Sequence, residues 1–160
     1  MRRRAQTAAV ACKDCVAGLH QDQVGQVKCK FCGVGQHQDQ AGQAQCKGAP
    51  CGLGTFFEHV AQASAVLCKD CAAGQFQNAT GQTSCKGSAC VSGKFFEHAA
   101  QVAAVACKDC VIPGQFQDQA GQTDCKGTAC VAGKFFEQVA QTAAVTCKDC
   151  VSGEFQDQAG

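Results

Sequence analysis

CKDCAAGQFQNATGQTSC, residues 68–85, contains the pattern on which the rest of this sequence is built. Two cysteines separated by two residues open the stretch, a glycine and an aromatic ring follow, and a third cysteine closes it after a polar segment. The opening CKDC also occurs at 12–15, 107–110 and 147–150, and close variants of the whole stretch fill the chain between them. A repeated cysteine doublet therefore organises the sequence.

The composition favours cross-links over a conventional core. One residue in ten is cysteine, 16 in 160, a density typical of disulfide scaffolds. Large apolar side chains are scarce, with ten Phe, one Met, and no Trp or Tyr. Burying a Phe contributes roughly 2–3 kcal/mol, whereas ordering each residue costs about 1–2 kcal/mol of backbone entropy. Ten Phe cannot hold this chain in place, so disulfides or metals must supply the remaining stability.

The spacing of the doublets predicts a linear array of modules. From Cys46 onward, doublets with two and four inner residues alternate, which gives a double unit of about 39–40 residues, typical of quasi-one-dimensional repeats. The expected organisation is an N-terminal tail or fragment edge at 1–11, followed by modules at about 12–28, 29–45, 46–67, 68–84, 85–106, 107–124, 125–146 and an incomplete 147–160. The incomplete last module indicates a piece of a longer repeat chain.

Short and long gaps between doublets predict different local structures. In the short gap GQFQDQAGQTDC, residues 114–125, Asp118 and Gly121 occupy the first and fourth places of a type I turn, which suits a bulged hairpin. The long gap at 93–107 instead carries a run of Ala and Gln, which are good helix formers. Short helical turns, or a wider hairpin loop, are expected there. The predicted fold class is small and disulfide-rich: an elongated array of cysteine-rich hairpin modules, mostly irregular with short β-hairpins.

Three chemistries compete for the cysteines. A disulfide that closes about 15 residues contributes roughly 3 kcal/mol, so a disulfide array compensates for the missing core. Residues 12–32 also have the spacing of a zinc ribbon, and the 16 cysteines divide into four sets of four. Against zinc, only CKFCG places Gly directly after the second cysteine of a Cys-x2-Cys pair, and no linkers separate the doublets. Redox catalysis needs one singular low-pKa thiol, which near-equivalent doublets do not offer. Disulfides are preferred, without a metal site or cofactor.

The repeat resembles a known family. Cys-x2-Cys-x2-Gly-x-aromatic-x5–6-Gly-x3-Cys, best seen at 68–85, resembles the ephrin-receptor-like cysteine-rich repeat and is similar to the single-disulfide modules of tumour necrosis factor receptors. The resemblance implies an elongated extracellular architecture, disulfides rather than zinc, and no catalysis. The sequence departs from it after the second cysteine, where Val, Gly or Ala replaces the usual Pro, and at the ring, where Phe or His replaces the usual Tyr.

The resemblance also implies a pairing of the cysteines, in which the second of one doublet bonds to the first of the next. The implied pairs are Cys15–Cys29, Cys32–Cys46, Cys51–Cys68, Cys71–Cys85, Cys90–Cys107, Cys110–Cys125 and Cys130–Cys147. Cys12 and Cys150 would then pair beyond these residues. A rival scheme joins first with third and second with fourth cysteine of neighbouring doublets. It uses every cysteine and stays open here, because spacing does not decide connectivity.

Other residues point to surface roles. The formal charge of +1 argues against a nucleic-acid face, and no segment approaches the roughly 20 apolar residues of a membrane span. Asn78-Ala79-Thr80 is an N-glycosylation sequon on an expected hairpin tip. The paired rings at 56–57, 95–96 and 135–136 are expected to expose one ring each, as a possible binding row.

These observations predict a non-catalytic extracellular repeat segment. It would serve as a structural spacer, adhesion or ligand-binding stalk of a larger secreted or cell-surface protein, with a protein or glycan partner. No enzyme is predicted, because the sequence contains no Ser-His-Asp set, phosphate loop or paired carboxylates. The alternative is an intracellular zinc-binding array with four sites of four cysteines each, which would mediate macromolecular contacts.

Overall fold

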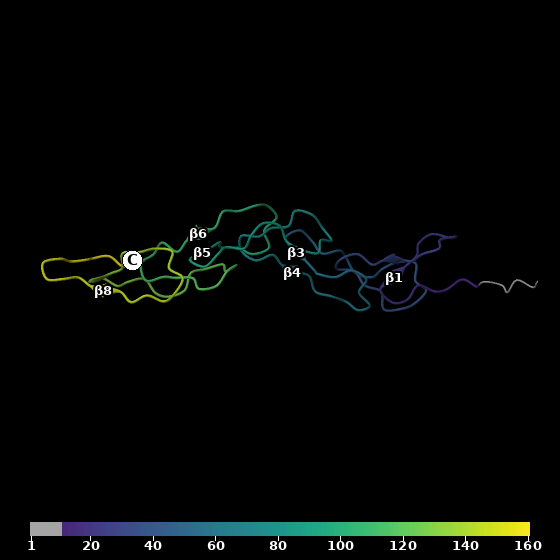
Figure 1. Cartoon of the computed structure of the whole chain (residues 1–160), viewed down its shortest axis with the longest axis horizontal. Helices are drawn as coiled ribbons and strands as arrows, with labels where there is room; N and C mark the ends of the chain where they lie inside the picture. The colour runs from purple at the N-terminus through teal and green to yellow at the C-terminus, as the bar shows by residue number, and fades with distance from the viewer. Residues whose placement is uncertain (1–10) are drawn as a thin grey trace, which may run out of the picture.

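Seven hairpins, each closed by one disulfide, follow one another along a long, narrow body (Figure 1). The structure is a computed structural model that describes residues 11–160, so all but the last residue of the predicted tail 1–11 lies outside it. Hairpins 1 to 7 are named here by the residues between their disulfide-bonded cysteines: 15–29, 32–46, 51–68, 71–85, 90–107, 110–125 and 130–147. Colour in Figure 1 runs from one end of the body to the other, as a linear array requires.

In residues 11–160, eight strands of two residues each form four antiparallel pairs. In each pair, the first strand directly follows the glycine at the third place after a doublet. The second strand lies inside the next Cys-x2-Cys doublet. The residues inside the doublet therefore pair with a strand of the hairpin that precedes the doublet. The pairs are β1 (Leu19–His20) with β2 (Lys30–Phe31), β3 (Thr55–Phe56) with β4 (Lys69–Asp70), β5 (Lys94–Phe95) with β6 (Lys108–Asp109), and β7 (Lys134–Phe135) with β8 (Lys148–Asp149).

The short hairpins turn where the sequence predicts. Gly121 adopts a φ of 70°, in the left-handed region that a glycine enters without steric cost. Gly42 and Gly81, at the equivalent turns, have φ values of 71° and 64°. Across hairpin 6, Phe116 and Lys126 form an antiparallel bridge with both backbone bonds made. The turn therefore brings the two cysteines of the hairpin to the same end.

The expectation of helical turns in the long hairpins is wrong, and residues 11–160 contain no helix. Ala61, Ala100 and Ala140 instead have φ values of 54–58°, a left-handed conformation that costs roughly 1–2 kcal/mol for a residue with a Cβ. Bonds to the preceding hairpin explain it. The Ala100 N–H donates to the Cys71 carbonyl, and the Gln101 carbonyl accepts from the Gln77 N–H, both at 2.9 Å. Helical bonding would leave these groups without partners.

Sulfur and amide groups fill the interior instead of large apolar side chains. The second cysteine of each doublet from Cys15 to Cys130 is at most 7% exposed, and the largest fully buried side chains are Gln38, Gln77 and Gln117. Every buried side-chain nitrogen and oxygen in the described part of the chain has a hydrogen-bond partner. The predicted fold class, a small disulfide-rich array of short hairpins, is confirmed.

Candidate functional site

The repeated site of this molecule is the junction of a disulfide, a buried glutamine and the neighbouring hairpins. The structure brings together all fourteen cysteines of the predicted set, each second cysteine of a doublet with the first cysteine of the next. Their Cα–Cα distances of 5.6–5.9 Å lie in the usual range for disulfides. In each bond, the cysteine that ends a doublet is buried, and its partner, which begins the next doublet, is half-buried. Every disulfide therefore has an inner and an outer sulfur.

Cys12 and Cys150, at opposite ends of the described chain, are not in disulfides. The Cys12 side chain is exposed and Cys150 is half-buried. Cys12 is the first cysteine of its doublet and Cys150 the second. The cysteines at these two positions of the other doublets are disulfide-bonded.

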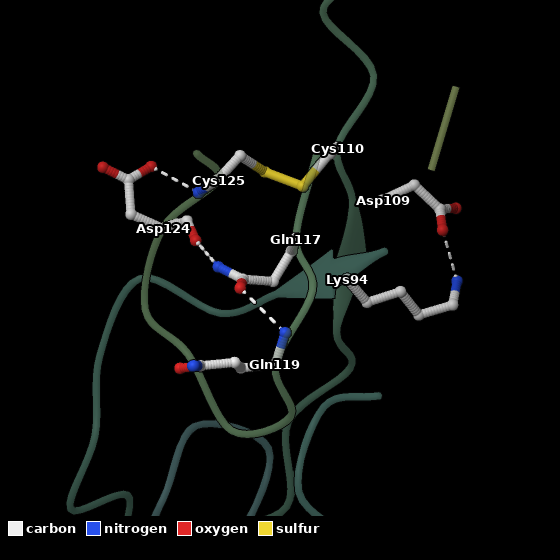
Figure 2. Close-up of a disulfide and its surroundings, with 7 residues drawn as sticks. All are labelled: Lys94, Asp109, Cys110, Gln117, Gln119, Asp124 and Cys125. Atoms are coloured by element: carbon white, nitrogen blue, oxygen red, sulfur yellow. Dashed lines mark hydrogen bonds and ion pairs between the residues drawn. A yellow bond between two sulfur atoms is a disulfide. The ribbon is translucent and has the colours of Figure 1, made fainter. Parts of the chain in front are cut away.

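A buried glutamine side chain braces each of hairpins 2, 4 and 6, and Figure 2 shows it in hairpin 6. In hairpin 6, the Gln117 side chain donates through Nε2 to the Asp124 carbonyl, and its Oε1 accepts from the Gln119 N–H at 3.1 Å. Gln77 makes the same two bonds in hairpin 4, to the Ser84 carbonyl at 2.7 Å and from the Ala79 N–H at 3.1 Å. One side chain therefore fixes both arms of the hairpin beside the disulfide.

The backbone of the same glutamine joins three successive hairpins. The Gln117 carbonyl accepts from the Gly93 N–H of hairpin 5 at 2.7 Å, and the Gln117 N–H donates to the Gln141 carbonyl of hairpin 7 at 2.9 Å. The same three-part ladder runs through Gly54, Gln77 and Gln101, and through Gly18, Gln38 and Gln62. Hairpins 2, 4 and 6 are consequently each hydrogen-bonded to the hairpin before and the hairpin after.

Close backbone contacts make this ladder dependent on glycine. A Cβ placed on Gly93 would lie 2.4 Å from the carbonyl oxygen of Ala140, and one on Gly54 would lie 2.1 Å from that of Ala100. Both distances are far below van der Waals contact. The glycine at the third place after each of these doublets therefore lets the long loop two hairpins further along approach the backbone.

Paired charges lie along the surface. Lys126 Nζ donates to Asp118 at 2.5 Å, and the equivalent pair Lys47–Asp39 spans 2.6 Å. These hydrogen bonds hold the pKa of the Asp118 and Asp39 carboxyls below their ordinary value. In hairpin 4, Asn78 Oδ1 accepts the same bond from Lys86. The pairs are exposed and contribute little to stability, so they act as surface charges held at regular positions.

The expected row of exposed rings is wrong. All six Phe of the pairs at 56–57, 95–96 and 135–136 are half-buried, because the first ring of each pair lies in a strand that packs beside the next hairpin. Two phenylalanines outside these pairs, Phe31 and Phe155, are exposed. The valines that directly follow a doublet are exposed as well. Their side chains are 59–63% exposed: Val16, Val91, Val111, Val131 and Val151. At these positions, valine stands where the resembled repeat usually has proline.

One histidine lies beside sulfur. His20 Nδ1 is 3.1 Å from Cys46 Sγ, and the ligand atoms of His20, Cys32 and Cys46 all lie within 4.8 Å of one another. The two sulfurs share a disulfide, so they offer no thiolate to a metal in this state. His59 and His98 are exposed and lie edge-on to Phe57 and Phe96.

Sequence reasoning missed the buried glutamines and the histidine–sulfur contact. A signal for the first was present, since Gln occupies the place directly after the ring in every short hairpin, at 21, 38, 77 and 117. An exposed position tolerates different residue types from one repeat to the next, so the repeated Gln indicates a structural role. No signal marked the contact of His20 with Cys46, which are 26 residues apart.

Comparison with known proteins supports the geometry. Residues 4–47, which include hairpins 1 and 2, match the family model described as tyrosine-protein kinase ephrin type A/B receptor-like. No curated protein matches the chain. The part that the structure describes has no helix long and apolar enough to cross a membrane. The disulfides and the family match point to an extracellular, non-catalytic repeat. The chain is thus a tandem cysteine-rich repeat whose first modules match the ephrin type A/B receptor-like family.

Proposed function

We propose that the chain is a rigid spacer within a larger secreted or cell-surface protein. The observation that carries the proposal is the backbone ladder in which one buried glutamine bonds to the hairpins on both sides, as Gln77 does to Gly54 and Gln101. The Cys71–Cys85 disulfide closes the hairpin that contains this glutamine. Bending between hairpins would therefore break backbone bonds rather than only rearrange side chains.

The surface suits contacts with proteins rather than chemistry on small substrates. From Val91 onward, the exposed valines that follow the doublets offer small apolar contacts at an interval of 20 residues, and exposed ion pairs such as Lys126–Asp118 add charge to the surface. A protein or glycan partner along the rod would meet the same features repeatedly. Weak contacts repeated along one rigid body gain strength through effective concentration, which suits an adhesion or ligand-binding stalk.

Small-angle X-ray scattering tests the spacer. A compact domain of 160 residues has a radius of gyration of roughly 15 Å and the unfolded chain roughly 42 Å. The oxidised chain is expected between these values, with the scattering of a thin rod, and reduction is expected to move it towards the unfolded value. A compact oxidised particle, or a rod that survives full reduction, would contradict the proposal.

The pairing of the cysteines is part of the proposal. Peptide mapping without reduction is expected to recover the consecutive pairs, such as Cys71 with Cys85, and intact mass to show seven pairs of hydrogen atoms fewer than in the reduced chain. Free thiols with about one zinc per four cysteines would support the zinc array instead. Crossed pairs, such as Cys15 with Cys32, would contradict the ladder geometry.

We also propose that Asn78 carries an N-linked glycan. Its side chain is exposed at the tip of hairpin 4, and only its Oδ1 is bonded, to Lys86. The Nδ2 that receives the sugar makes no hydrogen bond in the structure. Expression through a secretory pathway should give a mass that falls on treatment with an amidase specific for N-glycans, and Thr80→Ala should abolish the difference. An unmodified Asn78 after secretion would refute the assignment.

A further inference from the structure

His20 occupies a place that a phenylalanine holds in the other double units. It is the second residue of β1, as Phe56 is of β3 and Phe95 is of β5. In all three units, the N–H of the next residue donates to the carbonyl of a glutamine in the following hairpin, at Gln43, Gln82 and Gln122. Each of these glutamines lies three residues before an outer cysteine, at 46, 85 and 125. The three rings are therefore neighbours of equivalent disulfides.

The difference in ring changes what the disulfide contacts. Phe95 and Cys125 line one cavity, whose other lining residues include Ile112 and the charged Glu97, Lys108 and Asp109. The phenyl ring itself carries no group that exchanges a proton. His20 Nδ1 instead lies 3.1 Å from Cys46 Sγ. In residues 11–160 this is the one hydrogen-bond-distance contact between a side-chain nitrogen and a disulfide sulfur.

The outer sulfur of this disulfide is also open to small molecules. A surface cavity of about 300 Å³ is lined by His20, Asp22, Gln36, Ala44, Gln45 and Cys46. Cys32, the inner partner, is fully buried. A thiol that enters the cavity meets Cys46 Sγ and the imidazole together, and cannot reach Cys32.

We propose that Cys46 is a site of thiol–disulfide exchange with small-molecule thiols, with His20 as the proton-transfer residue. The sulfur of the incoming thiol bonds to Cys46 Sγ while its proton passes to His20 Nδ1. The Cys32–Cys46 bond breaks, its electron pair leaves on Cys32 Sγ, and the imidazolium returns the proton to that thiolate. The products are a mixed disulfide on Cys46 and a free Cys32 thiol, so atoms and electrons balance without an added oxidant or reductant.

The imidazole favours this exchange for two reasons. The attacking species is the thiolate, so a base at the point of attack raises the fraction of the incoming thiol that reacts. An imidazolium within 4.8 Å of the leaving Cys32 sulfur stabilises the negative charge that develops there. Because each hairpin contacts only nearby hairpins, opening this one bond alters a single joint of the array while the other disulfides remain.

Exchange with reduced glutathione tests the proposal on the full chain. Cys12 and Cys150 are first blocked with N-ethylmaleimide, so that no thiol of the chain competes. After a short exposure to glutathione, iodoacetamide traps the freed thiols and peptide mass spectrometry locates both labels. The expected products are glutathione on Cys46 and the alkyl group on Cys32, formed roughly tenfold faster than at the equivalent disulfides, because a hydrogen bond to a charged group is worth about that factor.

Two reciprocal variants separate the imidazole from simple exposure. His20→Phe, which installs the ring found elsewhere in the array, is expected to slow exchange at Cys46 to the rate at Cys85 and Cys125. Phe95→His is expected to raise exchange at Cys125, and it keeps the test decisive if His20→Phe disturbs hairpin 2. Unchanged rates in both variants would overturn the proposal. Glutathione on Cys32 would also overturn it. Equal exchange at Cys15–Cys29 would overturn it too, because it would indicate fraying of the end of the array.

Discussion

Replacing Gln117 by alanine should loosen the junction of hairpins 5, 6 and 7. The side chain is 1% exposed and makes two bonds, to the Asp124 carbonyl and from the Gln119 N–H. Each of the two buried hydrogen bonds contributes a net of about 1 kcal/mol, and the lost methylene adds about 0.8 kcal/mol. The expected local destabilisation is therefore about 2–3 kcal/mol, because alanine can replace none of these contacts.

Native-state hydrogen exchange measures this loss with the disulfides intact. The Gly93 N–H, which donates to the Gln117 carbonyl, and the Gln117 N–H, which donates to Gln141, report directly on the junction. A loss of about 2–3 kcal/mol corresponds to roughly 30- to 150-fold faster exchange. Because the array is quasi-one-dimensional, the effect should fade beyond the neighbouring hairpins, so the Gly18 N–H should be unaffected.

The matched control is Gln119→Ala, in the same hairpin. The Gln119 side chain is exposed, and its backbone N–H, which donates to Gln117, is retained in alanine. Its effect is expected within about 0.5 kcal/mol of zero. The reasoning is refuted if Gln117→Ala accelerates exchange no more than this control, or if it accelerates exchange equally along the whole chain.

Two further perturbations test the close contacts and the charges. In denaturant unfolding, Gly93→Ala should lower the free energy of unfolding more than Gly133→Ala does, by about 1–3 kcal/mol of overpacking. Both glycines have φ values of 81–83°, but only the Cβ at 93 meets a carbonyl oxygen. Equal losses would show that backbone strain alone matters. Lys126→Met should raise the pKa of Asp118 towards its ordinary 3.8, observed by carboxyl NMR titration, because the hydrogen bond from Lys126 is the main cause of its lowering. Since the folded pKa is the lower one, the contribution of Asp118 to stability is present above pH 3.8 and is lost as the pH falls through the lowered value, whereas Asn78 at the equivalent turn has no carboxyl to titrate. An unchanged pKa of Asp118 in Lys126→Met would contradict this account.

Local sequence determined the features that depend on covalent chemistry and on single turns. A content of one cysteine in ten residues, with few large apolar side chains, leaves cross-linking as the source of order, so the fold class followed from composition. Asp118 and Gly121 predicted a turn because their preferences act within four residues. The consecutive pairs, by contrast, were implied by resemblance to a family, since spacing alone allowed a crossed scheme.

Tertiary structure decided whatever depends on contacts between hairpins. The run after Phe96 has helix-forming residues, yet Ala100 adopts a positive φ, because the groups that a helix would bond internally are bonded to hairpin 4. Gln117 is polar, yet it is buried, because two backbone groups are placed to satisfy its amide. His20 meets Cys46 only once β1 has paired and hairpin 2 has folded against it. Propensity and polarity are properties of a residue, whereas these three outcomes depend on partners many residues away.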